Sequence, residues 1–298
     1  MMTKVVRISG IVFIVVFSVI SIFFSLAERD LRVGEDTFTK KILSYPSFFE
    51  DRFYDIRMRN NLKPKAFDDR LILVKIDEES LEKVGRFPFT RNVWAKFMDK
   101  MSAFNAKVVS FDVLFVEPEK ACRAEDSPDI NFSKAIKRFQ SVKGRKVVLP
   151  YSLNIDGHKT HREFKAMPDV MFNFMVNSKV KKNLGLSKMT VSKDAWPLKA
   201  YLDTTAGIGH IHATSDADGI YRHYHMLSNV EDLYFPSFSL MIYQYFTNDR
   251  PELKIENEGD ANLKLKNGTI KINNMGKSKI RWLGGPEAFP RVSIRDIL

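Results

Sequence analysis

The order of apolar and polar positions between Arg70 and Phe115 predicts a strand, a helical segment and a second strand parallel to the first. The first strand is an apolar run from Leu71 to Ile76. Asp77 follows in the position of a helix cap, and a short helical turn over 78–84 is expected to end at Gly85. This stretch therefore reads as one complete folding unit, with polar residues where its elements end.

A longer helix is expected to begin after Thr90, which can cap it. Its apolar residues recur at intervals of three and four, so one side of this helix should lie on a sheet. These residues are Val93, Trp94, Phe97, Met98, Met101 and Phe104. The second strand, Val108 to Phe111, shows little alternation, as expected for a parallel strand that helices cover on both faces.

Later segments extend this pattern. A helix over 131–140 leads to a short apolar run, Val147 to Leu149, which we interpret as a third parallel strand. Three further elements are expected: a helix over 238–246 capped by Ser237, a hairpin over 263–272 with its turn at Asn267 and Gly268, and a strand over 279–283. The sequence therefore predicts an α/β fold with a mostly parallel sheet, covering helices and antiparallel hairpins.

The N-terminus contains a candidate membrane anchor. Ile8 to Leu26 is a run of 19 residues without a charge, long enough to span a bilayer as one helix. Lys4 and Arg7 precede it, which places the N-terminus in the cytoplasm and everything after the anchor outside. A cleaved signal peptide is the alternative, because Ser25 and Ala27 are small residues at the spacing that a signal peptidase reads. We expect residues 1–27 to be the cytoplasmic tip and anchor, and 28–298 to form a periplasmic domain held at the inner membrane by a single pass.

Composition and charge narrow the function further. At 44% hydrophobic and 28% charged residues the chain is typical of a globular protein, and its single cysteine, Cys122, cannot form an internal disulfide. The formal net charge of +11 is compatible with a nucleic-acid partner. However, Lys and Arg are scattered among acidic neighbours and no recognition motif accompanies them, so nucleic acid is not an expected partner.

Four of the six histidines lie between Gly209 and His225, on either side of a predicted turn at Asp216 to Gly219. If this turn closes a hairpin, the four imidazoles share one face of the sheet. We expect no cofactor, but four imidazoles on one face could hold a transition metal, and a proton sensor is the other chemical interpretation. The plain alternative is a set of ordinary surface or hydrogen-bonded side chains. The residues are His210, His212, His223 and His225.

An enzyme would need residues in named roles, and the strand ends supply the best candidates. Asp77 and Asp112 each follow a predicted parallel strand, and adjacent strands would bring both carboxylates to the same sheet edge. The chain has no Gly-x-Ser-x-Gly elbow, Walker loop, dinucleotide fingerprint or His-Glu-x-x-His helix. We therefore expect no catalytic residues, with Asp77 as a helix cap and Asp112 as a loop residue.

Short motifs recur in a fixed order along most of the chain. They consist of Val74, Ile76, Asp77, Ser80, Leu81, Gly85, Phe87, Pro88, Arg91, Phe111, Asp112 and Phe115, then Gly207, Gly209, Asp216 to Gly219, Arg222, Pro236, Ser237 and Phe289 to Ser293. This order resembles the CHASE2 family of extracytoplasmic bacterial sensor domains, and the resemblance covers roughly residues 45 to 298.

The resemblance implies a ligand- or environment-sensing input domain of a transmembrane receptor. The stimulus is an unknown small molecule or condition, and the receptor is expected to work as a homodimer. The mainly helical segment 36–63 would then couple the anchor to the domain, or serve as an ordinary packing helix. The last residues resemble a family segment that leads into another strand, further membrane helices and an output such as a nucleotide cyclase, a histidine kinase or a Ser/Thr kinase.

Candidate ligand-binding residues are the strand-end carboxylates and the charged residues of the matching motifs: Asp77, Arg91, Asp112, Asp218 and Arg222. Two alternatives to sensing remain. One is a membrane-tethered metal-dependent hydrolase that uses the histidines and the strand-end aspartates. The other is a structural or partner-binding module of the cell envelope.

Overall fold

The computed structural model describes residues 15–19, 37–62, 68–120, 127–153, 173, 176, 196–216, 218–230, 233–257, 260–273, 275–285 and 288–298. Most of the predicted anchor, and Cys122, lie outside these residues. The chain divides into two compact units, one formed by Met1–Asp68 with Arg281–Phe289 and the other by Asp69–Ile280 with Pro290–Leu298.

The first unit contains the long helix α2 (Thr37–Asn60), which confirms the helical prediction for 36–63. Within it, the guanidinium of Arg57 lies 3.3 Å from the carboxylate of Glu50, two turns earlier. Residues 15–19 of the predicted anchor are helical. Among the residues that the structure describes, no helix is both long and apolar enough to cross a membrane.

The second unit contains a parallel sheet in the order β2–β3–β4. Its strands are β2 (Val108–Ser110), β3 (Lys146–Tyr151) and β4 (Gly207–His210), paired in parallel throughout. The first two confirm the strands predicted at 108–111 and 147–149. All six residues of β3 except Lys146 are buried, as expected for the central strand of a sheet that helices cover on both faces.

Helices do cover both faces of this sheet. Val109 and Val147 are register partners, and Phe111 continues on their side, where its ring contacts Phe97 of α4 (Arg91–Ala103) and Phe132 of α5 (Pro128–Gln140). The helix α7 (Phe238–Thr247) packs on the opposite side of the sheet. It lies so close to β4 that a Cβ added to Gly209 would be 2.5 Å from the Cα of Phe238. Only glycine lets the strand and the helix approach so closely.

The predicted helices have largely the expected boundaries and faces. In α4 the expected contacts are made by Trp94, Phe97 and Met98, which are buried. Phe104 is a correction: it is the residue that ends α4, and 64% of it is exposed, so it does not extend the apolar stripe. Thr90 precedes α4 in extended conformation but its side chain makes no capping bond, whereas Ser237 caps α7 by accepting from the Leu240 amide at 3.3 Å.

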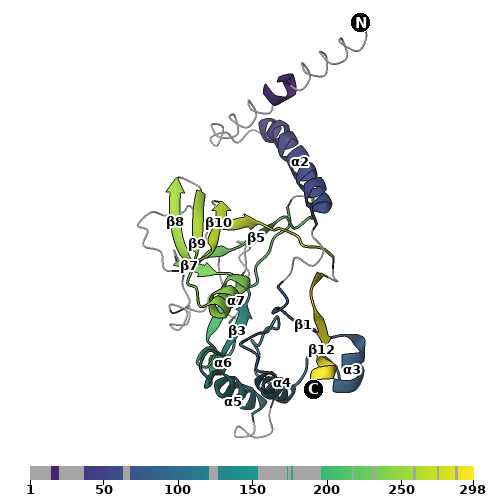
Figure 1. The fold of residues 1–298 in the computed structure, drawn as a ribbon, viewed down its shortest axis with the longest axis vertical. Helices are drawn as coiled ribbons and strands as arrows, with labels where there is room; N and C mark the ends of the chain where they lie inside the picture. Colours follow the sequence, from purple (N-terminus) through teal and green to yellow (C-terminus); the bar gives the residue numbers. More distant parts are fainter. Residues whose placement is uncertain are drawn as a thin grey trace. The chain divides into compact units, whose positions relative to one another are not determined.

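The predicted first strand is β1 (Leu73–Lys75), and it pairs in parallel with β12 (Arg291–Ser293). α3 (Glu78–Val84) follows β1, and α8 (Ile294–Ile297) follows β12 (Figure 1). Gly85 ends α3 with φ of +116° and donates to the Leu81 carbonyl, as predicted. The strand partner of β1 therefore comes from the far end of the sequence.

The remaining strands are antiparallel. β8 (Glu252–Asn257), β9 (Asp260–Leu265) and β10 (Gly268–Asn273) form one sheet, and the predicted turn at Asn267 joins the last two. β6 (Leu227–Val230) pairs with β7 (Leu233–Pro236), and β5 (His223–His225) pairs with β11 (Lys277–Lys279). The strand expected at 279–283 is wrong beyond Lys279, because β11 ends there. The described part of the chain thus combines helices, parallel sheets and antiparallel hairpins.

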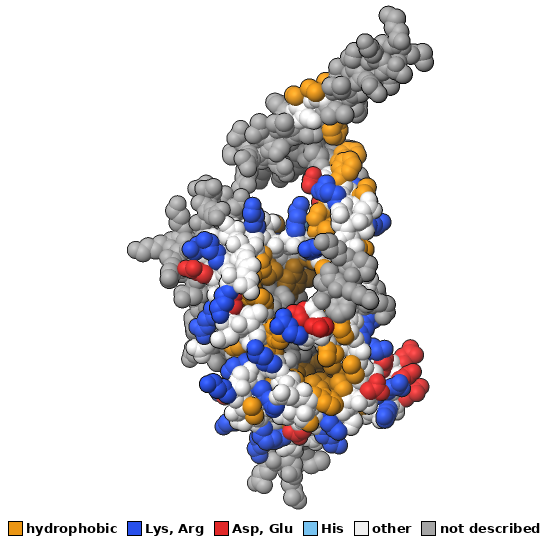
Figure 2. Space-filling view, viewed as in Figure 1, with side chains coloured by type: hydrophobic (Ala, Val, Ile, Leu, Met, Phe, Trp, Pro, Cys, Tyr) orange, Lys and Arg blue, Asp and Glu red, His pale blue; other side chains and the backbone are white. Residues whose placement is uncertain are grey.

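Two groups of buried side chains stabilise this second unit. The larger lies between the parallel sheet and the surrounding helices, including the four-residue helix α6 (Lys199–Leu202). The smaller group lies under β6 to β10 and includes Leu227, Leu253 and Leu263, each at most 1% exposed. Figure 2 shows Lys and Arg side chains distributed over one face among apolar and uncharged groups, which agrees with the scattered basic residues in the sequence.

Candidate functional site

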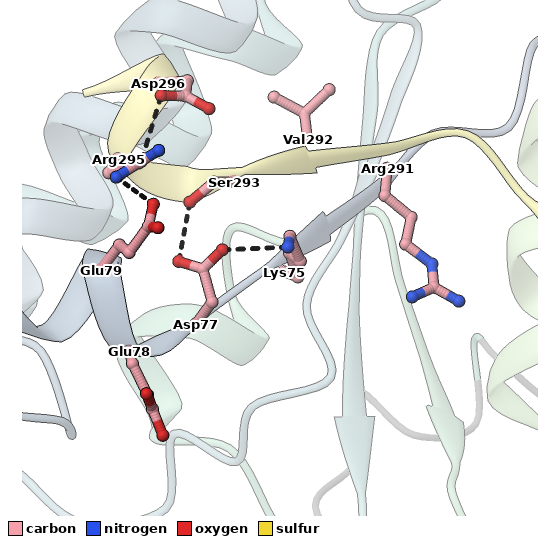
Figure 3. Close-up of a pocket in the computed structure, with 9 residues that line it drawn as sticks. All are labelled: Lys75, Asp77, Glu78, Glu79, Arg291, Val292, Ser293, Arg295 and Asp296. Atoms are coloured by element: carbon pink, nitrogen blue, oxygen red, sulfur yellow. Dashed lines mark hydrogen bonds and ion pairs between the residues drawn. The ribbon is translucent and has the colours of Figure 1, made fainter. Parts of the chain in front are cut away.

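An open pocket of about 630 Å³ lies at the carboxyl ends of β1 and β12. Charged groups of both signs line it: Lys75, Asp77, Glu78, Glu79, Arg291, Arg295 and Asp296, together with Val292 and Ser293. Figure 3 shows the Asp77 carboxylate between Lys75 and Ser293, with Arg295 above it between Glu79 and Asp296. The carboxyl edge of parallel strands is where open α/β sheets place ligands, so this pocket is a candidate site.

Asp77 is held by several donors at once. Its carboxylate accepts from the backbone amide of Ser80 at 3.0 Å and from the hydroxyl of Ser293 at 2.9 Å, and Lys75 Nζ lies 3.1 Å away. Hydrogen bonds from the side chains of Ser80 and Ser293 are the main cause that holds the pKa of Asp77 well below its usual range. The predicted role as the cap of α3 is therefore confirmed.

The other charges of the pocket also pair with one another. The guanidinium of Arg295 contacts the carboxylate of Glu79, and its Nε lies 3.3 Å from Asp296. Basic and acidic groups thus alternate around the opening. Such a lining can hold a small zwitterionic or polar molecule.

The structure does not bring Asp77 and Asp112 to one sheet edge, so this prediction is wrong. β1 pairs with β12, whereas β2, which Asp112 follows, pairs with β3. Asp112 is exposed, and its negative charge adds to the effect of burial in raising the pKa of Tyr224. β1 and β2 follow one another in the sequence and were therefore expected to pair. Instead, β12 from the end of the chain pairs with β1.

Arg91 lies in a largely buried network of hydrogen bonds. Its Nε donates to the carboxylate of Asp129 at 3.1 Å, and its guanidinium lies 4.8 Å from the ring centre of Phe115. Asp129 also accepts from the hydroxyl of Tyr201 at 2.6 Å and from the amide of Glu119 at 2.8 Å. These contacts join α4, α5 and α6, so the geometry gives Arg91 a structural role.

Asp218 and Arg222 bind each other. Arg222 is 1% exposed, and it donates to both carboxylate oxygens of Asp218 at 2.9 and 2.7 Å and to Asp216 at 3.2 Å. The hydrogen bonds from Arg222 lower the pKa of Asp218 to about 2. The predicted turn is present, since Gly219 has φ of +82° and donates to the Asp216 carbonyl at 2.9 Å.

The prediction that one hairpin carries all four histidines is wrong. β4 joins the parallel sheet through β3, and β5 pairs with β11. Because β3 holds β4, the chain from residue 211 to the turn lies outside any strand and cannot pair with β5. His223 is thereby directed to Asp216, whose carboxylate lies 3.1 Å from its Nδ1.

The other three histidines nevertheless form a group. His210 is fully buried and His225 is 3% exposed, and the rings of His212 and His225 lie 4.5 Å apart. Burial is the main cause that lowers the pKa of His210 well below its usual value, and the neighbouring histidines add to it. Burial likewise lowers the pKa of His225 to about 3. His210 and His225 are therefore neutral at physiological pH.

Several residues that define these sites had no clear signal in the sequence. Ser228 contacts His210 Nε2 at 3.0 Å and Thr214 contacts His225 Nε2 at 3.1 Å, while Tyr201 and Asp129 complete the Arg91 network. Serine, threonine and tyrosine are common, and nothing in their spacing indicates these partners. In the part of the chain that the structure describes, no group of three or more His, Cys, Asp or Glu side chains is arranged around a metal-sized space.

Comparison with known proteins identifies the family. No curated protein and no solved structure matches the chain significantly. The family model of the CHASE2 domain, an extracytoplasmic sensory domain, matches residues 37–298. The match spans α2 and every described element after it, and it begins before the residues that carry the resemblance in the sequence. Since it covers most of the 298 residues, the chain belongs to the CHASE2 family.

Proposed function

We propose that this chain is the extracytoplasmic input domain of a transmembrane signalling receptor, and that it responds to a small molecule or a condition outside the membrane. The observation that carries the proposal is the CHASE2 match over 37–298, which begins shortly after the apolar run Ile8 to Leu26. A sensory domain that directly follows such a run is held at the membrane surface by a single helix.

The charges beside the apolar run support the orientation. Lys4 and Arg7 precede it, and basic residues next to a membrane helix stay on the cytoplasmic side. The domain then lies outside the inner membrane, which agrees with the extracytoplasmic character of the family.

Signal transmission needs a stimulus that distinguishes two arrangements of the receptor. A ligand that binds both arrangements with equal affinity does not change their populations. A change in the population ratio from 1:99 to 99:1 requires about a 10⁴-fold difference in affinity between the two arrangements. We propose a homodimer as the context for these arrangements. The 24-residue helix α2 follows the anchor in the chain and is long enough, at roughly 36 Å, to carry a displacement along its axis.

Cysteine labelling tests the orientation. In a Cys122→Ser background, Lys199→Cys places a thiol at a position whose side chain is 85% exposed, and Thr3→Cys places one in the N-terminal tip. A membrane-impermeant maleimide applied to intact spheroplasts should label position 199 and leave position 3 unlabelled until the membrane is permeabilised.

The opposite pattern, with position 199 labelled only after permeabilisation, would reject the proposal. Extraction of the membrane fraction at alkaline pH tests the anchor in the same cells. Retention of the full-length chain supports an anchor, and release of a shortened chain supports cleavage near Ala27.

A further inference from the structure

The helices α4 and α5 end close together, at the edge of the parallel sheet where its strands begin. Arg145, which follows α5, donates to the carbonyl of Ser102 and to the side-chain oxygen of Asn105, both at 3.1 Å. The backbone amide of Lys146 donates to the Lys107 carbonyl at 2.9 Å, where β2 and β3 begin. The turn after α5 is therefore fixed against the end of α4.

Two apolar side chains are exposed at this end. Phe104, the residue that ends α4, is 64% exposed, the largest exposed fraction among the large apolar side chains that the structure describes. Val142, in the turn after α5, is 47% exposed. Single exposed apolar residues are common in soluble proteins, so the meaning of these two depends on the groups around them.

Basic side chains surround the two apolar residues. They come from the last turns of α4 and α5, from the segments that follow these helices, and from the end of α7. Lys107 connects the end of α7 to this group, because its Nζ donates to the Phe246 carbonyl at 2.8 Å. The exposed basic residues are Lys100, Lys107, Arg138, Lys143 and Arg250. Together with Phe104 and Val142 they are called the basic tip.

Acidic groups do not balance this charge. The acidic residues of segments 99–107, 138–146 and 246–250 are Asp99 and Asp249. Asp99 lies 2.9 Å from the guanidinium of Arg138. Asp249 is 5% exposed and accepts from the Tyr243 hydroxyl at 2.9 Å. The fold thus gathers at one end basic residues that alternate with acidic ones along the sequence, and the surface there carries a net positive charge.

We propose that the basic tip binds the surface of a membrane that contains anionic phospholipids. Lys and Arg side chains pair with the headgroup phosphates, while exposed aromatic and aliphatic side chains enter the boundary between headgroups and acyl chains. A membrane therefore matches both the charges and the apolar residues of the tip. A nucleic acid would use the charges, but the chain has no recognition motif to accompany them.

The inference rests on the proposed function, because the anchor keeps the domain within reach of a bilayer. Binding of the tip gives the tethered domain two arrangements, one docked on the membrane and one free. Two arrangements of this kind are what a stimulus has to distinguish, since a ligand acts only through its different affinity for each.

Fluorescence of the full-length chain in lipid nanodiscs tests the docking. In a Cys122→Ser background, Ala103→Cys carries an NBD label at an exposed position beside Phe104, and Lys199→Cys carries the same label on α6. The discs contain phosphatidylcholine alone, or phosphatidylcholine with an equal part of phosphatidylglycerol. NBD emission rises and shifts to the blue when the label leaves water.

Phosphatidylglycerol should raise the emission at position 103 and leave position 199 unchanged. The rise should decline as NaCl is added, because the screening length of exposed charges falls from about 10 Å at 0.1 M to about 3 Å at 1 M. Phe104→Ser should also lower the emission at position 103, although every cation of the tip is still present.

Two double variants with the same change of charge, both labelled at position 103, separate the tip from net charge. Lys100→Ser with Lys143→Ser removes two cations of the tip, and Lys83→Ser with Lys199→Ser removes two exposed cations from α3 and α6. Each cation near an anionic surface contributes roughly a 5-fold factor, so the tip variant should lower the ratio of docked to free domains about 25-fold. The control variant should dock like the wild type.

Equal emission at position 103 in the two kinds of disc, or an equal loss in the two double variants, would overturn the inference. A response to a soluble DNA duplex, with none to phosphatidylglycerol, would overturn it in favour of nucleic acid. Circular dichroism of each variant confirms that folded proteins are compared. Loss of the chain from the discs would reject the anchor, and docking with it, whereas a chain that stays in the discs without responding to phosphatidylglycerol would reject the docking alone.

Discussion

The hydroxyl of Ser293 donates a hydrogen bond of 2.9 Å to the carboxylate of Asp77, although 216 residues separate the two in the chain. Ser80, which is fully buried, lies 2.9 Å from the same hydroxyl. The carboxylate that begins α3 is thereby joined to the last residue of β12. The first strand of the second unit is thus fixed in part by the last strand of the sequence.

Replacing Ser293 by alanine should weaken this junction. The change removes a 6% exposed hydroxyl that is bonded to Asp77 and Ser80, and loss of such a group typically costs about 1 kcal/mol of unfolding free energy. Urea denaturation followed by tryptophan fluorescence measures the difference. Ser215→Ala, at an exposed serine, is the control and should change the free energy by less than about 0.5 kcal/mol. Equal effects of the two changes would show that the Asp77 bond does not stabilise the fold.

The close approach of β4 and α7 gives a second prediction. A Cβ at position 209 would lie 2.5 Å from Cα and 2.6 Å from the backbone nitrogen of Phe238, and 2.7 Å from the carbonyl oxygen of Ser237. Backbone atoms cannot move aside as a flexible side chain can, so Gly209→Ala should cost about 3 kcal/mol or more. Gly268→Ala is the matched control, because no atom lies within 4 Å of its added Cβ. A melting temperature of Gly209→Ala equal to that of Gly268→Ala would contradict this packing.

The sequence predicts those parts of the fold that depend on neighbouring residues. The cap at Asp77, the glycine after α3 and the hairpin turn at Asn267 were all predicted, because each is determined by a few adjacent side chains. The strands β2 and β3 were also found from their apolar runs. Such patterns report whether a segment is buried and where it ends.

Pairing between distant segments could not be predicted in this way. Nothing in Leu73–Lys75 indicates that Arg291–Ser293 is its partner, and nothing in the histidine segment shows that β3 holds β4 away from β5. The partners of several candidate binding residues could not be predicted for a related reason. A charged side chain in a short motif can face a ligand or a buried counter-charge, and only the fold reveals that Arg91 meets Asp129.

The Asp129 network leads to a third prediction. Tyr201 is fully buried and its hydroxyl donates to Asp129 at 2.6 Å, and burial followed by this hydrogen bond raises the pKa of Tyr201. Tyr201→Phe keeps the ring but removes a bond to a charged group, so it should lower the unfolding free energy by about 2 kcal/mol. Tyr221→Phe is the control, because Tyr221 is 47% exposed. If thermal unfolding shows that Tyr201→Phe and Tyr221→Phe change stability by the same amount, the hydrogen bond from Tyr201 to Asp129 contributes nothing to stability.

The pairing of Asp218 with Arg222 makes stability depend on pH in a defined range. Hydrogen bonds from Arg222 lower the pKa of Asp218 from 3.8 to about 2 in the folded state. The unfolded state therefore takes up a proton first as the pH falls. The contribution of Asp218 is fully present above about pH 5, declines as the pH falls through about 4, and is lost near pH 2.

Asp218→Asn isolates this contribution, because asparagine cannot ionise and every other carboxylate is unchanged. The wild type should be the more stable protein at pH 7, and the difference in unfolding free energy between the two should narrow as the pH is lowered from 4 toward 2. Urea titrations at half-unit intervals of pH measure it. The control is Asp203→Asn, whose carboxylate pairs at the surface with Lys199, a side chain that is 85% exposed. A difference that stays constant over the acid range would mean that Arg222 does not stabilise the ionised form of Asp218, and the buried guanidinium would then need another explanation.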